Sequence, residues 1–117
     1  MERVIDLDVL ADRLRPVMSE WRRWATVSPL TWRDSEAAGP RTITPDRSSI
    51  QDPESVGFVL HRHDSDDVLK IAVWTGGWAD LEYLLEGEVF TFSPFYRDTD
   101  ETCAAVIKDV EEFGAFR

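Results

Sequence analysis

The chain has 117 residues, the size of one domain, and a formal net charge of −10. Residues 1–51 carry eight acidic and eight basic side chains, whereas residues 52–117 carry fifteen acidic and five basic ones. The excess negative charge therefore lies entirely in the second part of the chain. A surface of this sign repels nucleic acid and anionic lipid and attracts basic partners. We expect neither nucleic-acid binding nor membrane binding.

Cysteine content and hydropathy favour a cytoplasmic protein. Cys103 is the single cysteine, which excludes an intramolecular disulfide and fits a reducing compartment. The first residues carry acidic side chains every few positions and lack the apolar stretch of a signal peptide. No apolar run approaches the roughly 18 residues that a membrane span needs. We expect a single cytoplasmic domain over residues 1–117.

The chain opens with the pattern of an amphipathic helix. Apolar side chains recur at steps of three and four residues, at Leu7, Leu10, Leu14, Val17, Met18, Trp21 and Ala25. Asp6 or Asp8 can cap this helix at its N-terminus. Pro16 removes a hydrogen bond from the helix interior. Because the apolar stripe stays in phase across Pro16, the pattern predicts one bent helix rather than two.

The next part of the chain has weaker signals. Residues 28–34 fit a short strand around Leu30 and Trp32. Residues 35–54 contain three prolines, a glycine and several hydroxyl side chains, which predicts a loop. A loop of this length is unusual in a compact domain, so we expect it to be either mobile or part of the working surface.

Residues 56–95 contain four consecutive strand patterns joined by short turns. The turns are the aspartate-rich segment 64–67, the pair Gly76-Gly77 and the pair Glu86-Gly87. The predicted strands cover residues 56–63, 68–75, 78–85 and 88–95. Their side chains alternate between a largely apolar face and a mixed face, as expected when helices cover one side of a sheet.

A second helix is predicted at the end of the chain. Asp98 and Glu101 have the spacing of a capping box, Thr99 is a competing cap, and Gly114 is expected to end the helix. The buried stripe consists of Val106, Ile107, Val110 and Phe113. The order of elements predicts an α+β domain with two layers: an antiparallel meander sheet of four to five strands, with an N-terminal and a C-terminal helix.

Metal binding is one hypothesis for the function. His61 and His63 are two residues apart and therefore share a strand face, and Asp64 follows at once. A His-x-His pair with a carboxylate is a recognised ligand arrangement. No more distant histidine is available to complete the set, so two solvated histidines beside an acidic turn are the simpler interpretation. We predict no cofactor and keep His61 and His63 as an alternative metal site.

Catalysis is less well supported than binding. Asp80 and Glu82 share a strand face with Trp78, a row that suits contact with a cation or a basic side chain. Carboxylate catalysis would require one carboxyl group kept protonated in an apolar pocket. Cys103 is interpreted as a core residue, because the acidic residues around it would raise its thiol pKa. We predict that the protein is not an enzyme.

The stretch 74–83, WTGGWADLEY, continues into an acidic strand and a capped acidic helix. In this respect residues 56–113 resemble small acidic immunity proteins of actinobacterial polymorphic toxin systems, without assignment to a specific family. The resemblance implies a cytosolic inhibitor that binds a cognate toxin domain, often a basic nuclease. It transfers no site residue to this chain.

These features together predict a non-enzymatic acidic binding protein, foremost an inhibitor or immunity protein that blocks a basic partner such as a toxin domain. The predicted contacts are Asp64, Asp66, Asp67, Trp78, Asp80, Glu82, Glu86 and Glu88. Aromatic anchors within a charged rim are typical of such interfaces. Two alternatives stay open: a cytosolic chaperone or adaptor for a secreted effector, which would form a homodimer, and a small metal-binding protein that uses His61 and His63.

Overall fold

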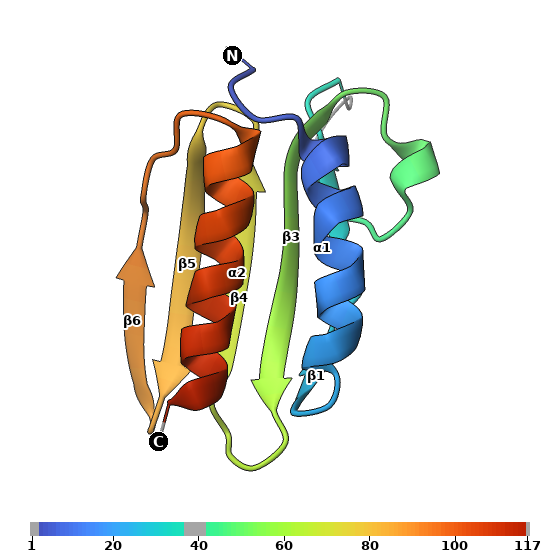
Figure 1. The fold of residues 1–117 in the computed structure, drawn as a ribbon. Helices are drawn as coiled ribbons and strands as arrows, with labels where there is room; N and C mark the ends of the chain where they lie inside the picture. Colours follow the sequence, from blue (N-terminus) through green and yellow to red (C-terminus); the bar gives the residue numbers. More distant parts are fainter. Residues whose placement is uncertain (1–2, 37–41, 117) are drawn as a thin grey trace.

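A computed structural model describes residues 3–36 and 42–116 and shows two layers (Figure 1). One layer is an antiparallel sheet, and the other consists of the helices α1 (Leu7–Trp21) and α2 (Thr99–Ala115). This arrangement confirms the predicted α+β architecture, with six strands where four to five were expected. The strands are β1 (Ala25–Val27), β2 (Thr31–Asp34), β3 (Pro53–Arg62), β4 (Val68–Trp74), β5 (Trp78–Leu85) and β6 (Glu88–Phe92).

The sheet is organised around β3. On one edge of β3, the strands β4, β5 and β6 follow as the predicted antiparallel meander. On the other edge, β1 and β2 lie end to end, β1 beside residues 60–62 and β2 beside residues 53–57. The six described strands therefore occupy only five positions side by side.

The first helix is shorter than its apolar stripe predicted. It is capped by Asp6, whose carboxylate accepts a hydrogen bond from the Val9 N–H at 3.1 Å, and Pro16 lies inside one continuous helix. The helix ends at Trp21, and Ala25 begins β1 instead. Ala25 is buried in its strand, as it would also be on the apolar stripe of a longer helix. The hydrophobic pattern therefore could not distinguish a helix from a strand at this residue.

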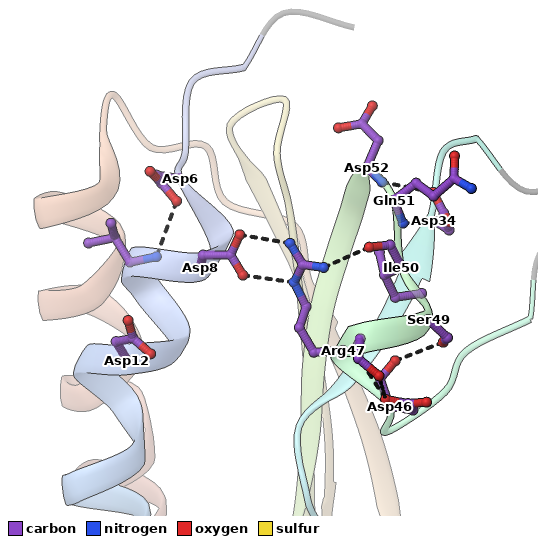
Figure 2. A network of polar contacts seen from close by, with 12 residues as sticks. Asp6, Asp8, Asp12, Asp34, Asp46, Arg47, Ser49, Ile50, Gln51 and Asp52 are labelled. Carbon is purple, nitrogen blue, oxygen red and sulfur yellow. Dashed lines mark hydrogen bonds and ion pairs between the residues drawn. The ribbon is translucent and has the colours of Figure 1, made fainter.

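The predicted loop 35–54 contains a 3₁₀-helix, η1 (Arg47–Ser49), which is attached to α1. The guanidinium of Arg47 donates two hydrogen bonds to the Asp8 carboxylate, at 2.8 and 2.9 Å, as Figure 2 shows. It donates a third to the Ile50 carbonyl at 2.7 Å and lies over the Trp32 ring, 5.2 Å from its centroid. These bonds lower the pKa of Asp8.

The carboxylate of Asp34 holds both ends of the same segment. It accepts hydrogen bonds from the backbone N–H groups of Glu36, Gln51 and Asp52 at 2.9, 2.9 and 3.1 Å. Because β3 begins at Pro53, the last two residues of the predicted loop belong to the sheet. The described parts of this segment are therefore fixed to the domain by side-chain contacts and by a short backbone pairing, in which Trp32 and Thr44 exchange hydrogen bonds at 2.8 and 2.9 Å.

The hydrophobic core lies between the two helices and one face of the sheet. Its fully buried members come from both layers and include Leu10, Leu14, Leu60, Leu69, Ile71, Val73, Val106 and Val110. Burying one such side chain contributes roughly 1.5–3 kcal/mol to folding. The predicted helical stripes therefore supply the packing that holds the layers together.

Two turns of the sheet differ in length. The connection between β5 and β6 has two residues, as predicted, and Glu86 (φ 51°) and Gly87 (φ 82°) both have the positive φ of a type I′ turn. Trp74 pairs with Trp78, so the connection between β4 and β5 has three residues rather than the two expected at Gly76-Gly77.

The C-terminal helix starts where predicted and ends at Ala115, one residue beyond the glycine that was expected to end it. Asp98 caps it by accepting a hydrogen bond from the Glu101 N–H at 2.8 Å, and the helix continues through Gly114 to Ala115. A β-carbon at Gly114 would lie 2.7 Å from the Trp24 ring. This glycine therefore allows Trp24 to pack closely against the helix, rather than ending the helix.

Gly57 provides a test of the sheet's packing. A β-carbon there would lie 2.6 Å from the carbonyl oxygen of Ile71 in the neighbouring strand. We expect Gly57→Ala to lower the free energy of unfolding by about 1–3 kcal/mol, because backbone atoms must shift. Urea denaturation measures this change. Thr91→Ala, at an exposed strand position, is the control and should change it by less than about 0.5 kcal/mol. An equal effect of both substitutions would contradict the tight fit.

Candidate functional site

The structure separates the eight predicted contact residues into two regions. Trp78, Asp80 and Glu82 lie on the sheet face that points away from the helices, which we call the open face. The other five lie in or beside the turns at one end of the sheet and form the turn cluster: Asp64, Asp66, Asp67, Glu86 and Glu88. The predicted contacts therefore do not form one surface.

Within the turn cluster, two of the aspartates have structural roles. Asp67 is buried and accepts a hydrogen bond from the Glu86 N–H at 3.0 Å, which ties the β3–β4 turn to the β5–β6 turn. Asp64 forms an ion pair at 3.1 Å with the buried guanidinium of Arg62, which also donates to the Phe113 carbonyl. These two carboxylates stabilise the fold, and Asp66 is fully on the surface.

The open face carries charges of both signs. Asp80 accepts hydrogen bonds from the Trp74 indole N–H and the Ser93 hydroxyl, both at 3.0 Å. Trp74 stacks on Trp78 with ring centroids 5.7 Å apart, and the Arg33 guanidinium lies over the Trp74 ring. Glu82 is exposed, and Lys70 is its partner across β4 and β5. The face that carries the predicted row of Trp78, Asp80 and Glu82 is thus mixed in charge, as the alternation of side chains predicted.

The histidines do not form a metal site with other described side chains. Both are exposed, and His63 lies beyond the end of β3. Among the described residues, there is no group of three or more histidine, cysteine, aspartate or glutamate side chains placed to hold a metal ion. The metal-binding alternative therefore lacks a complete set of ligands in this part of the chain.

Cys103 belongs to the core, as predicted. Its side chain is buried in the first turns of α2, and burial raises the pKa of the thiol, with a further contribution from Asp100. A raised pKa leaves little thiolate near neutral pH, so this position does not favour nucleophilic chemistry.

A groove that the sequence analysis did not predict runs between α2 and β6, with a volume of about 850 Å³. Its floor consists of apolar and aromatic side chains from β5 and β6, including Leu81, Tyr83, Phe90 and Phe92. Its wall is the side of α2 that carries Asp109 and Glu112. In Figure 1, β6 lies beyond α2 at the edge of the sheet, with no helix in front of it.

The floor of the groove leaves large apolar side chains in solvent. Phe90 is 41% exposed and Phe92 is 55% exposed, although both point to the side of the sheet that carries the helices. Phe92 contacts the ring of Tyr83 edge-on at 5.8 Å, and Tyr83 contacts Phe113 of α2 at 6.2 Å. The exposed aromatic surface is therefore continuous with the core.

The wall of the groove brings negative charge against this apolar surface. Burial raises the pKa of Asp109, and the nearby Glu112 raises it further, while Lys108 opposes the shift without reversing it. Among the described residues, Asp109 has no hydrogen-bond or ion-pair partner, whereas Glu112 lies 3.9 Å from Lys108. Burial and then Asp109 also raise the pKa of Tyr83 to about 12. A cation placed in the groove would relieve this unfavourable environment of Asp109.

The outer edge of β6 has free backbone groups. The Ala79 N–H donates to the carbonyl of Pro94, the residue opposite it, at 3.1 Å. Hydrogen-bonded and non-hydrogen-bonded pairs alternate along an antiparallel ladder, so this bond shows which pairs of β5 and β6 are hydrogen-bonded. It follows that the N–H and C=O groups of Val89 and Thr91 point away from β5. No strand among the described residues pairs with this edge.

Comparisons of the chain with models of protein families, with curated proteins and with solved structures gave no match. The resemblance of residues 56–113 to immunity proteins therefore stays a prediction. Within the described part of the chain, no helix combines the length and apolar character needed to cross a membrane.

The charge in the groove wall provides a test. Because the pKa of Asp109 is raised in the folded state, folding favours its protonated form. This favourable contribution is complete below the ordinary carboxyl pKa and is lost as pH rises through the raised value. We expect Asp109→Asn to raise the midpoint of thermal unfolding near neutral pH, with the gain disappearing at acidic pH.

Circular dichroism during heating measures this effect across the pH range. Glu111→Gln is the matched control, because it removes the same charge from an exposed position of α2. The same gain in both variants would attribute the effect to the overall charge of the protein and contradict a specific role for burial at Asp109.

Proposed function

We propose that this protein is a non-enzymatic binding protein that inhibits a basic protein partner, and that the partner docks in the groove between α2 and β6. The observation that carries the proposal is the combination of exposed aromatic side chains, Phe90 and Phe92, with the partly buried carboxylate of Asp109, which has no hydrogen-bond or ion-pair partner within the described part of the chain. A contiguous apolar patch with a charged rim is typical of a protein–protein interface.

The sign of the charge supports a basic partner. The chain has a net charge of −10, and the excess lies in the part that contains both α2 and β6. Opposite charges accelerate association and make it sensitive to salt. Docking would also pair Asp109 with a cation. Blocking the basic active-site cleft of a toxin domain is one form that such inhibition takes.

The two tyrosine hydroxyl groups that line the groove suit contact more than proton transfer. Tyr83 and Tyr96 have pKa values raised to about 12, so their hydroxyl groups stay protonated near neutral pH. A general acid or base works best with a pKa near the pH of the reaction. This property supports the prediction of a binding protein rather than an enzyme.

The free edge of β6 favours the second candidate function, a chaperone or adaptor that forms a homodimer. Two copies could pair their β6 strands through the outward N–H and C=O groups of Val89 and Thr91. Sedimentation equilibrium separates the candidates: a stable dimer that holds an unfolded client supports the chaperone, and a monomer that binds a folded basic protein supports the inhibitor.

The proposed function is tested by isolating a partner from the native host and measuring its affinity and its inhibition. We expect a folded basic protein that is released by salt and whose activity falls on binding. Phe92→Asp should weaken binding at least about tenfold, because it places a charge in the apolar floor. Val89→Asp is the matched control, since Val89 lies on the same strand with 62% exposure and points to the open face.

Glu82→Lys on the open face tests the location predicted from the sequence. Glu82 is exposed and is the cleaner substitution there, whereas Asp80 accepts two hydrogen bonds that a lysine would remove. If Glu82→Lys weakens partner binding strongly and Phe92→Asp leaves it unchanged, the partner uses the open face and the groove assignment is wrong.

A further inference from the structure

We infer that the element of the partner that fills the groove is a basic amphipathic helix, which lies beside α2 as a third helix of the helical layer. This inference rests on the proposed function and adds the shape and chemistry of the ligand. Its basis is the width of the sheet, the length of β6 and the arrangement of charges on α2.

The width of the sheet leaves room for one more helix. Packed helices lie about 8–10 Å apart, and neighbouring strands lie about 4.8 Å apart, so one helix covers about two strands. The described sheet has five positions and carries two helices. In Figure 1, α1 and α2 lie in front of the β1 to β5 side, and β6 extends beyond α2. The uncovered position is therefore β6.

The length of β6 sets the length of the helix. Five residues of strand span about 17 Å at about 3.4 Å per residue. A helix rises about 1.5 Å per residue, so about 11 residues, or three turns, cover this strand. A helix of three turns presents an apolar stripe at intervals of three and four residues, which can cover the rings of Phe90 and Phe92.

The charges on α2 determine which side of the helix is basic. Asp109 and Glu112 are three residues apart and both line the groove, so they form an acidic pair along α2, with Lys108 as a single basic neighbour on the same wall. A neighbouring helix with lysine or arginine at the same spacing could pair with both carboxylates. Asp109 is the stronger anchor, because its carboxylate is partly buried, whereas Glu112 is exposed and lies 3.9 Å from Lys108.

A helix fits this site better than an added strand. A strand paired with the outer edge of β6 would satisfy the backbone of Val89 and Thr91, but it would lie beside the sheet. Strand side chains stand roughly perpendicular to the sheet. The rings of Phe90 and Phe92 would therefore stay exposed above such a strand, whereas a helix packed on the sheet covers them.

The inference can be tested with the full chain and a synthetic peptide as the probe. The probe is a fluorescent amphipathic peptide of about 14 residues with leucine on one face and lysine on the other. A scrambled peptide of the same composition is the control. We expect the amphipathic peptide to bind with a dissociation constant on the order of 10 µM, measured by fluorescence anisotropy, and the scrambled peptide to bind at least about tenfold more weakly.

Variants locate the binding site. Phe92→Asp and Asp109→Lys should each weaken peptide binding at least about tenfold. Val89→Asp and Glu111→Lys are the matched controls, because they make related changes on the same two elements outside the groove, and each should change binding by less than about threefold. Circular dichroism of every variant verifies that it is folded, and amide shifts in the NMR spectrum should concentrate in β6 and α2.

Four results would overturn the inference. Equal binding of the scrambled peptide, or equal losses for Asp109→Lys and Glu111→Lys, would show attraction by overall charge only. Nuclear Overhauser contacts between an extended peptide and Val89 or Thr91 would show strand addition. A dimer whose second copy covers the groove would show a different occupant. The proposed function fails separately, if the partner isolated from the native host is not basic or keeps its full activity when bound.

Discussion

The architecture of the molecule depends on hydrogen bonding along both edges of β3. This ten-residue strand holds β1 and β2 on one side and the meander on the other. Its approach to β4 requires Gly57, because a side chain there would collide with the backbone of Ile71. The start of β3 also determines where the preceding loop must end, and Asp34 and Arg47 hold that loop in place. One central ladder thus positions the sheet edges, the core and the loop.

The consequence for the surface is an imbalance between the layers. Two helices bury the apolar face of β3, β4 and most of β5, but the same apolar pattern continues onto β6, where Phe90 and Phe92 remain exposed. The acidic side of α2 borders this uncovered strip. An exposed apolar strip on an edge strand carries a risk of aggregation. A bound partner would remove that risk while using the same surface for recognition.

Local patterns in the sequence predicted the helices and the meander. Each of these elements packs one face against the core, so its apolar residues recur with the period of a helix or a strand. The extent of α1 was wrong at Ala25, which continues the helical stripe in phase but lies in β1. The groove was missed, since the placement of α2 across the sheet is a tertiary property. The sequence did contain one indication of the groove, because it predicted a sheet with more strands than two helices can cover. Asp67 and Asp80, predicted as contacts, also accept hydrogen bonds within the domain, which depend on tertiary placement and leave no pattern in the sequence.

The stacked indoles of Trp74 and Trp78 have a spectroscopic consequence. Their rings lie 5.7 Å apart and only 12° from parallel, close enough for their electronic transitions to couple. This pair lies on the open face, and no tryptophan lines the groove on the opposite side of the sheet. The circular dichroism that this coupling produces reports on the hairpin of β4 and β5, whereas the fluorescence is shared with Trp21, Trp24 and Trp32. The domain therefore carries an intrinsic optical label that distinguishes events on one surface from events on the other.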